Sequence, residues 1–176
     1  MINGSERQFF YQALSDSLGS LFSTALRLVG KPEIAEDLVQ EAVRKALEGV
    51  PRLRDQRKAR AWLFKILVNC VRDHLRRRRD WEEFDGEAEP GGVRPDAQAI
   101  AQARAHDVRE ALGELATSRR AIVVLIDIEG FTIAEAADML GIPMGTAASR
   151  LARARQDLQA RLRAYQPRIA EGGGKP

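Results

Sequence analysis

The stretch GFTIAEAADMLGIPMGTAASRLARARQDLQARL, residues 130–162, predicts two helices joined by a tight turn. Thr132 and Glu135 have the T-x-x-E spacing of a capping box, which marks the start of the first helix. The pattern breaks at Gly141, and a second helix follows to about residue 164. This order predicts a helix-turn-helix, a unit whose second helix enters the major groove of DNA.

The second helix of this unit is amphipathic. Its apolar stripe repeats every three or four residues and is expected to pack on the preceding helices. Arginine can bind guanine with two hydrogen bonds, serine can read a base edge, and both can hold phosphates. A solvated helix face is the alternative interpretation. The residues that we expect to contact DNA are Thr146, Ser149, Arg150 and Arg153.

A long helix over about residues 59–79 has one basic side. A row of arginines with one asparagine can follow the phosphates of a strand and hydrogen-bond a base. The loop before this helix, RLRDQRKAR, is also basic. An ordinary solvated face is again the alternative. The candidate contacts in this region are Arg54, Lys65, Asn69, Arg72, Arg76 and Arg77.

A helix predicted over about residues 33–48 has a mixed polar side rather than a basic one. This side suits a protein partner that carries basic residues better than it suits DNA, although composition alone would make it ordinary surface. Its outward residues include Asp37, Gln40, Glu41 and Arg44.

The charge distribution divides the chain into two modules. The net charge is +3 over 176 residues, but residues 1–80 carry +6, residues 81–98 carry −5 and residues 99–176 carry +2. The middle stretch contains two prolines and lacks helical periodicity, so we expect a flexible acidic linker. No strand-type alternation persists. The sequence predicts an all-α protein with a first module at 1–80, a linker at 81–98, a second module at 99–165 and a tail at 166–176.

Several function classes find no support in the sequence. There is no long apolar segment and no secretory signal, so a cytoplasmic protein without membrane contact is expected. Cys70 is alone and lies among apolar residues, which indicates a buried thiol, and the two histidines are isolated from any metal-binding pattern. No nucleophile triad, P-loop or GxGxxG is present. We therefore expect no enzyme, no metal and no cofactor.

Three stretches in order resemble a bacterial sigma factor of the compact extracytoplasmic-function (ECF) group. They are AEDLVQEAVRKAL (35–47), ARAWLFKILVNCVRDHLRRRR (59–79) and the helix-turn-helix quoted above. The resemblance implies that the first module is sigma region 2, which binds core RNA polymerase and the −10 promoter element. The second module would be region 4, which binds the −35 element.

The resemblance also implies a role for each polar side. Asp37, Gln40, Glu41 and Arg44 would contact core polymerase. Arg54, Lys65, Asn69, Arg72, Arg76 and Arg77 fall in the part that melts the −10 element and captures an unpaired base. Thr146, Ser149, Arg150 and Arg153 would read the −35 element.

The family pattern G-T-V-K/R-S-R is changed here, because Ala147 and Ala148 follow Thr146. Loss of one phosphate contact at 148 should lower the salt slope of DNA binding by about one unit. Many relatives are held inactive by an anti-sigma factor, and a similar partner is expected here. Two alternatives remain, a sigma-like decoy that sequesters an anti-sigma protein and a stand-alone helix-turn-helix regulator.

Overall fold

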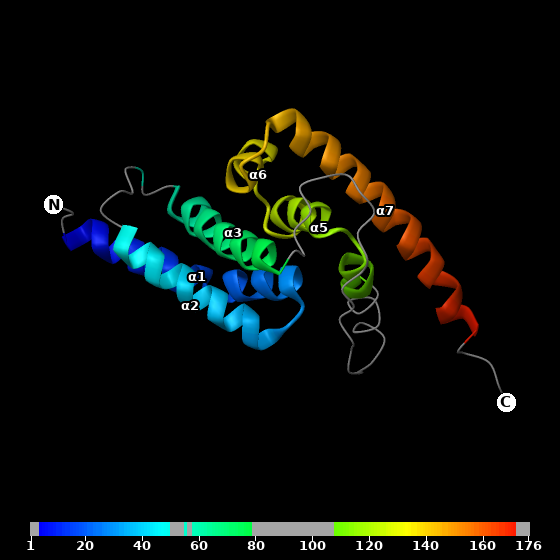
Figure 1. Ribbon diagram of the computed structural model, residues 1–176, viewed down its shortest axis with the longest axis horizontal. Coiled ribbons are helices and arrows are strands. Elements are labelled where there is room, and N and C mark those ends of the chain that lie inside the picture. Colours follow the sequence, from blue (N-terminus) through cyan, green and yellow to red (C-terminus); the bar gives the residue numbers. More distant parts are fainter. Residues whose placement is uncertain (1–3, 50–54, 56–57, 79–107, 172–176) are drawn as a thin grey trace.

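A computed structural model describes residues 4–49, 55, 58–78 and 108–171, and the regular structure in these ranges is entirely helical (Figure 1). The expected all-α class is therefore confirmed. The expected linker at 81–98 and the candidate DNA contact Arg54 lie outside the described residues.

The first module is a bundle of three helices, α1 (Gly4–Val29), α2 (Pro32–Gly49) and α3 (Ala59–Arg77). These bounds lie close to those expected from the sequence. Each helix packs on the other two, and the apolar side of α1 repeats at intervals of four and three residues. The buried members of that α1 stripe are Phe10, Leu14, Ser17, Leu21, Thr24 and Leu28.

The centre of α3 completes this core. Leu63, Leu67 and Val71 are buried with at most 2 % of their surface exposed. Cys70 is buried as expected, and burial raises the pKa of its thiol, with Lys45 Nζ 3.6 Å from its sulfur. These features are those of a packed structural thiol.

The second module begins, in its described part, with helical residues 108–113 and continues through α5 (Thr117–Val123). A π-helical turn, η3 (Val124–Ile128), follows directly. Neither Thr117 nor Ser118 caps α5. The N-cap is Ala116, with no side-chain capping bond, and Ser118 is buried in the packed interior.

The predicted helix-turn-helix is present as α6 (Ile133–Leu140) and α7 (Met144–Glu171). Thr132 and Glu135 form both bonds of the capping box, and Gly141 ends α6 with φ of 67°, a left-handed conformation that suits glycine. Ala147, Leu151 and Ala154 are buried, which confirms the inward stripe.

Helix α7 is longer than expected. We predicted an end near residue 164 and a loose tail from 166, but the helix continues to Glu171. Alanine, arginine and glutamine are strong helix formers, and extending an existing helix needs no new nucleus. Pro167 lies inside this extension without ending it.

The two modules pack against each other through α3 and α6, with smaller contacts from α1 to α5 and η3. In Figure 1, α5 and α6 lie between the three-helix bundle and α7. The sequence did not predict this arrangement, which brings residues about 70 positions apart into contact.

Candidate functional site

The polar side of α2, here called the α2 face, consists of Asp37, Gln40, Glu41 and Arg44. Asp37, Gln40 and Arg44 are exposed, and Glu41 is half-buried. Arg44 donates a bidentate pair of hydrogen bonds to the Glu41 carboxylate, with nitrogen–oxygen distances of 2.7 and 2.8 Å. It also donates a hydrogen bond of 2.6 Å to Glu48. The Arg44 bond holds the pKa of Glu41 at about 2. The face therefore presents a fixed set of charges to a partner.

The α7 face consists of Thr146, Ser149, Arg150 and Arg153. Ser149 and Arg153 are exposed, whereas Thr146 and Arg150 are half-buried. Ser149 Oγ donates to the carbonyl of Thr146 at 3.1 Å. All four residues lie in the first three turns of α7, away from its buried stripe and with Arg150 on the flank, so they can approach one groove of DNA together.

The α3 face consists of Lys65, Asn69, Arg72, Arg76 and Arg77. Arg76 and Arg77 are exposed near the end of the helix, and the other three are half-buried beneath the second module. Lys65 Nζ lies 2.8 and 2.9 Å from the two carboxylate oxygens of Asp138 on α6. Part of the α3 face is therefore exposed to solvent, and part of it is covered by α6.

Arg72 occupies the centre of the α3 face. Its Nη2 donates to Asn69 Oδ1 at 2.7 Å, and its Nη1 donates to the carbonyl of Leu140 at 3.2 Å. A Cβ at Gly141 would lie 3.2 Å from Arg72 Nη1, so the glycine also permits this close approach. Arg72 fixes the orientation of the Asn69 amide and binds the end of α6.

An aromatic contact joins the modules beside this point. Phe64 on α3 and Phe131, just before α6, lie edge to face with centroids 4.9 Å apart. The Arg60 guanidinium lies 4.8 Å from the first ring centroid and 4.3 Å from the second. Phe64 has no exposed surface and Phe131 only 6 %, so the contact is dry.

A buried carboxylate accompanies the two rings. Glu129 accepts a bond of 2.9 Å from Thr24 Oγ1 on α1 and one of 3.0 Å from Arg60 Nη2. Arg60 also donates to the Glu129 carbonyl at 3.0 Å. The sequence did not predict Arg60, Phe64, Glu129 or Phe131 as site residues. Thr24 was the available signal, because it is a polar residue within an apolar helical stripe.

Arg120 on α5 is a second buried charge, with 5 % of its surface exposed. It donates to the carbonyls of Gly113 at 2.6 Å and Leu115 at 3.0 Å, and to those of Arg27 and Leu28 at 3.4 Å. Burial lowers its pKa to about 10, so the guanidinium stays charged at neutral pH. It caps the end of helical residues 108–113 and touches the end of α1.

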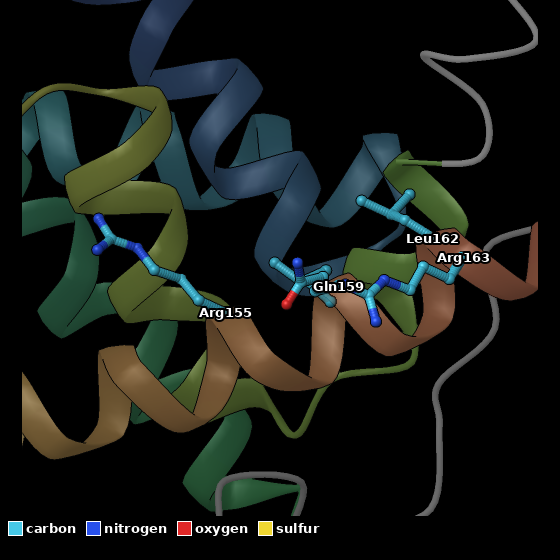
Figure 2. Close-up of a pocket in the computed structure, with 5 residues that line it drawn as sticks. Arg155, Gln159, Leu162 and Arg163 are labelled. Carbon is cyan, nitrogen blue, oxygen red and sulfur yellow. The ribbon is translucent and has the colours of Figure 1, made fainter.

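An open hollow of about 520 Å³ runs along the second half of α7. Figure 2 shows its lining side chains, with Arg155 at one end, Leu162 and Arg163 at the other and Gln159 between them, all projecting from α7. None of the α7-face residues lines it. Among the described residues, no helix is both long enough and apolar enough to cross a membrane.

Two protein-family models match the chain in order. Sigma-70 region 2 matches residues 14–81, and Sigma-70 region 4 matches residues 105–158. The ECF RNA polymerase sigma factor EcfG of Rhodopseudomonas palustris is 35 % identical over 150 residues, which cover 81 % of this chain and 79 % of the relative. SigM of Mycobacterium tuberculosis is 40 % identical over 134 residues, covering 76 % and 66 % respectively.

Solved structures give the same result. The sigma factor RpoE from Bartonella quintana, in complex with the anti-sigma factor NepR, aligns with a TM-score of 0.71 and 33 % identity over 88 % of this chain and 96 % of that one. CnrH in complex with the cytosolic domain of CnrY aligns with a TM-score of 0.58 and 29 % identity, over 90 % and 97 % respectively.

Proposed function

Because the chain belongs to the ECF group of RNA polymerase sigma factors, we propose that it binds core polymerase, recognises −10 and −35 promoter elements and directs transcription initiation. The observation that carries this proposal is the presence, in one chain and in family order, of both sigma regions. Such a protein acts by binding and needs no catalytic group of its own, and we place its action in the cytoplasm.

We assign the first module, residues 1–80, to core binding and the −10 element, and the second, residues 99–165, to the −35 element, with 81–98 as the linker. The exposed carboxylate and amide of Asp37 and Gln40, beside the Glu41–Arg44 pair, suit a basic protein surface. The α2 face is therefore the proposed contact with core polymerase.

The α3 face is the proposed −10 contact. Its cations can hold the phosphates of a single strand, and Asn69 can hydrogen-bond an unpaired base. Arg72 holds the Asn69 amide by its oxygen, which leaves the amide nitrogen as the donor for a base acceptor. The hydrogen bond from Arg72 therefore orients the Asn69 amide for contact with an unpaired base.

The α7 face is the proposed −35 contact. Ser149 and Arg153 are exposed at the start of a helix that lies in the position of a recognition helix. Ala147 is fully buried, so its small side chain belongs to the packing of α7 and not to the DNA surface. Only Ala148, which is exposed, changes the family pattern at the surface.

We further propose control by an anti-sigma factor. Both similar solved structures, RpoE with NepR and CnrH with the cytosolic domain of CnrY, are such complexes. Their likeness extends over most of this chain, so the same two modules are available to a partner of this kind here.

Reconstituted transcription tests the proposal. The chain is added to core polymerase without sigma factor, and specific run-off transcripts are sought on fragments of the source genome. We expect specific initiation, and Asn69→Ala should slow promoter opening with core affinity unchanged, because Asn69 lies on the α3 face and not on the α2 face. Binding of an anti-sigma protein without any transcript would instead identify a decoy, and absence of core binding would leave a stand-alone regulator.

A further inference from the structure

Met144 is an exposed apolar side chain at the start of α7. It is the first residue of that helix and is 62 % exposed, the largest exposed fraction among the large hydrophobic side chains that the structure describes. A helical side chain leans toward the N-terminal end of its helix, so Met144 projects past the start of α7. This side chain contributes little to the packed core and is open to a partner.

Met144 stands where a recognition helix reads bases. In a helix-turn-helix, the N-terminal residues of the second helix contact base edges. Met144 lies in the same turn of α7 as Thr146 and within two turns of Ser149. In Figure 1 the start of α7 lies at the periphery of the molecule, beside α6. A duplex that reaches Ser149 therefore passes close to Met144.

The residues beside Met144 allow a close approach. Ala148 lies about one turn further along the same side of α7, Ala152 lies about one turn beyond it, and both are exposed. Gly145 is exposed as well, and a Cβ there would meet no atom within 4 Å, so packing does not require this glycine. The missing side chain leaves the helix backbone accessible to a partner. Met144 therefore stands out from a low surface.

The chemistry of this surface suits one group of the DNA major groove. Thymine presents a C5 methyl group there, and apolar side chains contact it. Methionine is flexible and polarizable, so it can adapt its shape to such a group. We propose that Met144 reads a thymine methyl group of the −35 element and thereby determines part of the promoter specificity. This inference rests on the proposed function, because it takes α7 as the helix that enters the −35 major groove.

A methyl contact differs from the phosphate contacts that the arginines of α7 can form. Phosphate contacts weaken as salt rises, and they carry no sequence information. A contact between Met144 and a methyl group is apolar, so it depends on the base and not on salt. Discrimination for thymine should therefore stay constant as salt rises, while the total affinity for the promoter falls.

Deoxyuridine substitution isolates the methyl group, because uracil pairs like thymine but lacks the C5 methyl. The probe is a promoter duplex that gives a specific run-off transcript, synthesised with deoxyuridine in place of each thymidine of the −35 element in turn, on either strand. Its affinity for reconstituted holoenzyme is compared with that of the thymidine duplex at low and high salt. We expect one thymidine at which the substitution weakens binding about fourfold at both salt concentrations, the effect of burying one methyl group.

Met144→Gln keeps the length of the side chain and replaces its apolar end with an amide. Because Met144 is exposed, the fold should tolerate this change. Val108→Gln is the matched control, since Val108 is another exposed apolar side chain of the second module and lies outside α7. The deoxyuridine effect should shrink below about twofold in Met144→Gln and remain about fourfold in Val108→Gln.

Equal affinities for thymidine and deoxyuridine at every position of the −35 element would overturn the proposal. So would a deoxyuridine effect that persists in Met144→Gln. Specific promoter binding without a deoxyuridine effect refutes the role of Met144 and leaves the proposed function intact. If holoenzyme binds no promoter specifically, the proposed function fails, and the role of Met144 fails with it.

Discussion

Arg120→Met tests whether a buried guanidinium organises the second module. Methionine matches the stem of arginine in length but cannot donate a hydrogen bond. The change therefore removes the short bonds to the carbonyls of Gly113 and Leu115 and the longer ones to Arg27 and Leu28. Because these carbonyls end helical residues 108–113 and α1, the variant leaves helix ends without their partner.

The expected loss follows from three terms. Burial lowers the pKa of Arg120 to about 10, which corresponds to about 3 kcal/mol for keeping the charge buried, at about 1.36 kcal/mol per pKa unit. Its two short hydrogen bonds contribute about 1.5–3 kcal/mol each. They offset the cost of burial, so the buried cation changes the free energy of unfolding little overall. The variant then leaves two carbonyls unpaired at about 1–3 kcal/mol each. We expect a net destabilisation of about 2–4 kcal/mol.

Urea unfolding at neutral pH, followed by circular dichroism, measures this loss. Thermal unfolding should show a midpoint lower by roughly 5–15 °C, given about 2–4 °C per kcal/mol for a chain of this size. Arg119→Met is the matched control, since Arg119 pairs with a partly exposed Asp157 and should cost under about 1 kcal/mol. A loss below about 0.5 kcal/mol for Arg120→Met would refute the assignment of Arg120 as a cap.

Two further perturbations test other parts of the chain. Thr132→Ala removes the hydroxyl that accepts from Glu135 N at 3.2 Å and should cost about 1 kcal/mol in the same unfolding assay. Bonds from Thr132 lower the pKa of Glu135, so this stabilisation is present above its ordinary pKa of 4.5 and is lost as pH falls through the lower folded value. If the free energy of unfolding fell equally steeply with decreasing pH in Thr132→Ala and in the wild-type protein, this reasoning would be contradicted. Asp37→Ala should weaken core polymerase binding at least about fivefold in a titration, and the same loss in Glu33→Ala, one turn earlier on α2, would show a general charge effect instead.

Local features of the fold could be predicted because their causes are local. The capping box at Thr132 and Glu135 needs only residues three apart, and the turn at Gly141 needs only a residue that tolerates positive φ. The buried stripe of α7 follows from its 3.6-residue period. The C-terminal end of α7 was predicted too early, because helix propensity alone does not identify the residue at which a helix ends.

The contact between modules could not be predicted from periodicity. A helical period separates an inward from an outward side, but it does not say whether solvent or another module lies outside. Phe64 and Phe131 are 67 positions apart, and Thr24 and Glu129 are 105 apart. The α3 face was therefore recognised as polar, while the Phe64 ring beside it was not recognised as buried.

The α3 face holds cations that can bind a carboxylate of the same chain or a phosphate of DNA, but not both at once. An exposed pair such as Lys65–Asp138 contributes about 0–1 kcal/mol, which a strand with several phosphates can replace. The buried Glu129 contact is different, because breaking it leaves Thr24 and Arg60 to find other partners. Separation of the modules therefore costs more at the buried Glu129 contact than at the exposed Lys65–Asp138 pair.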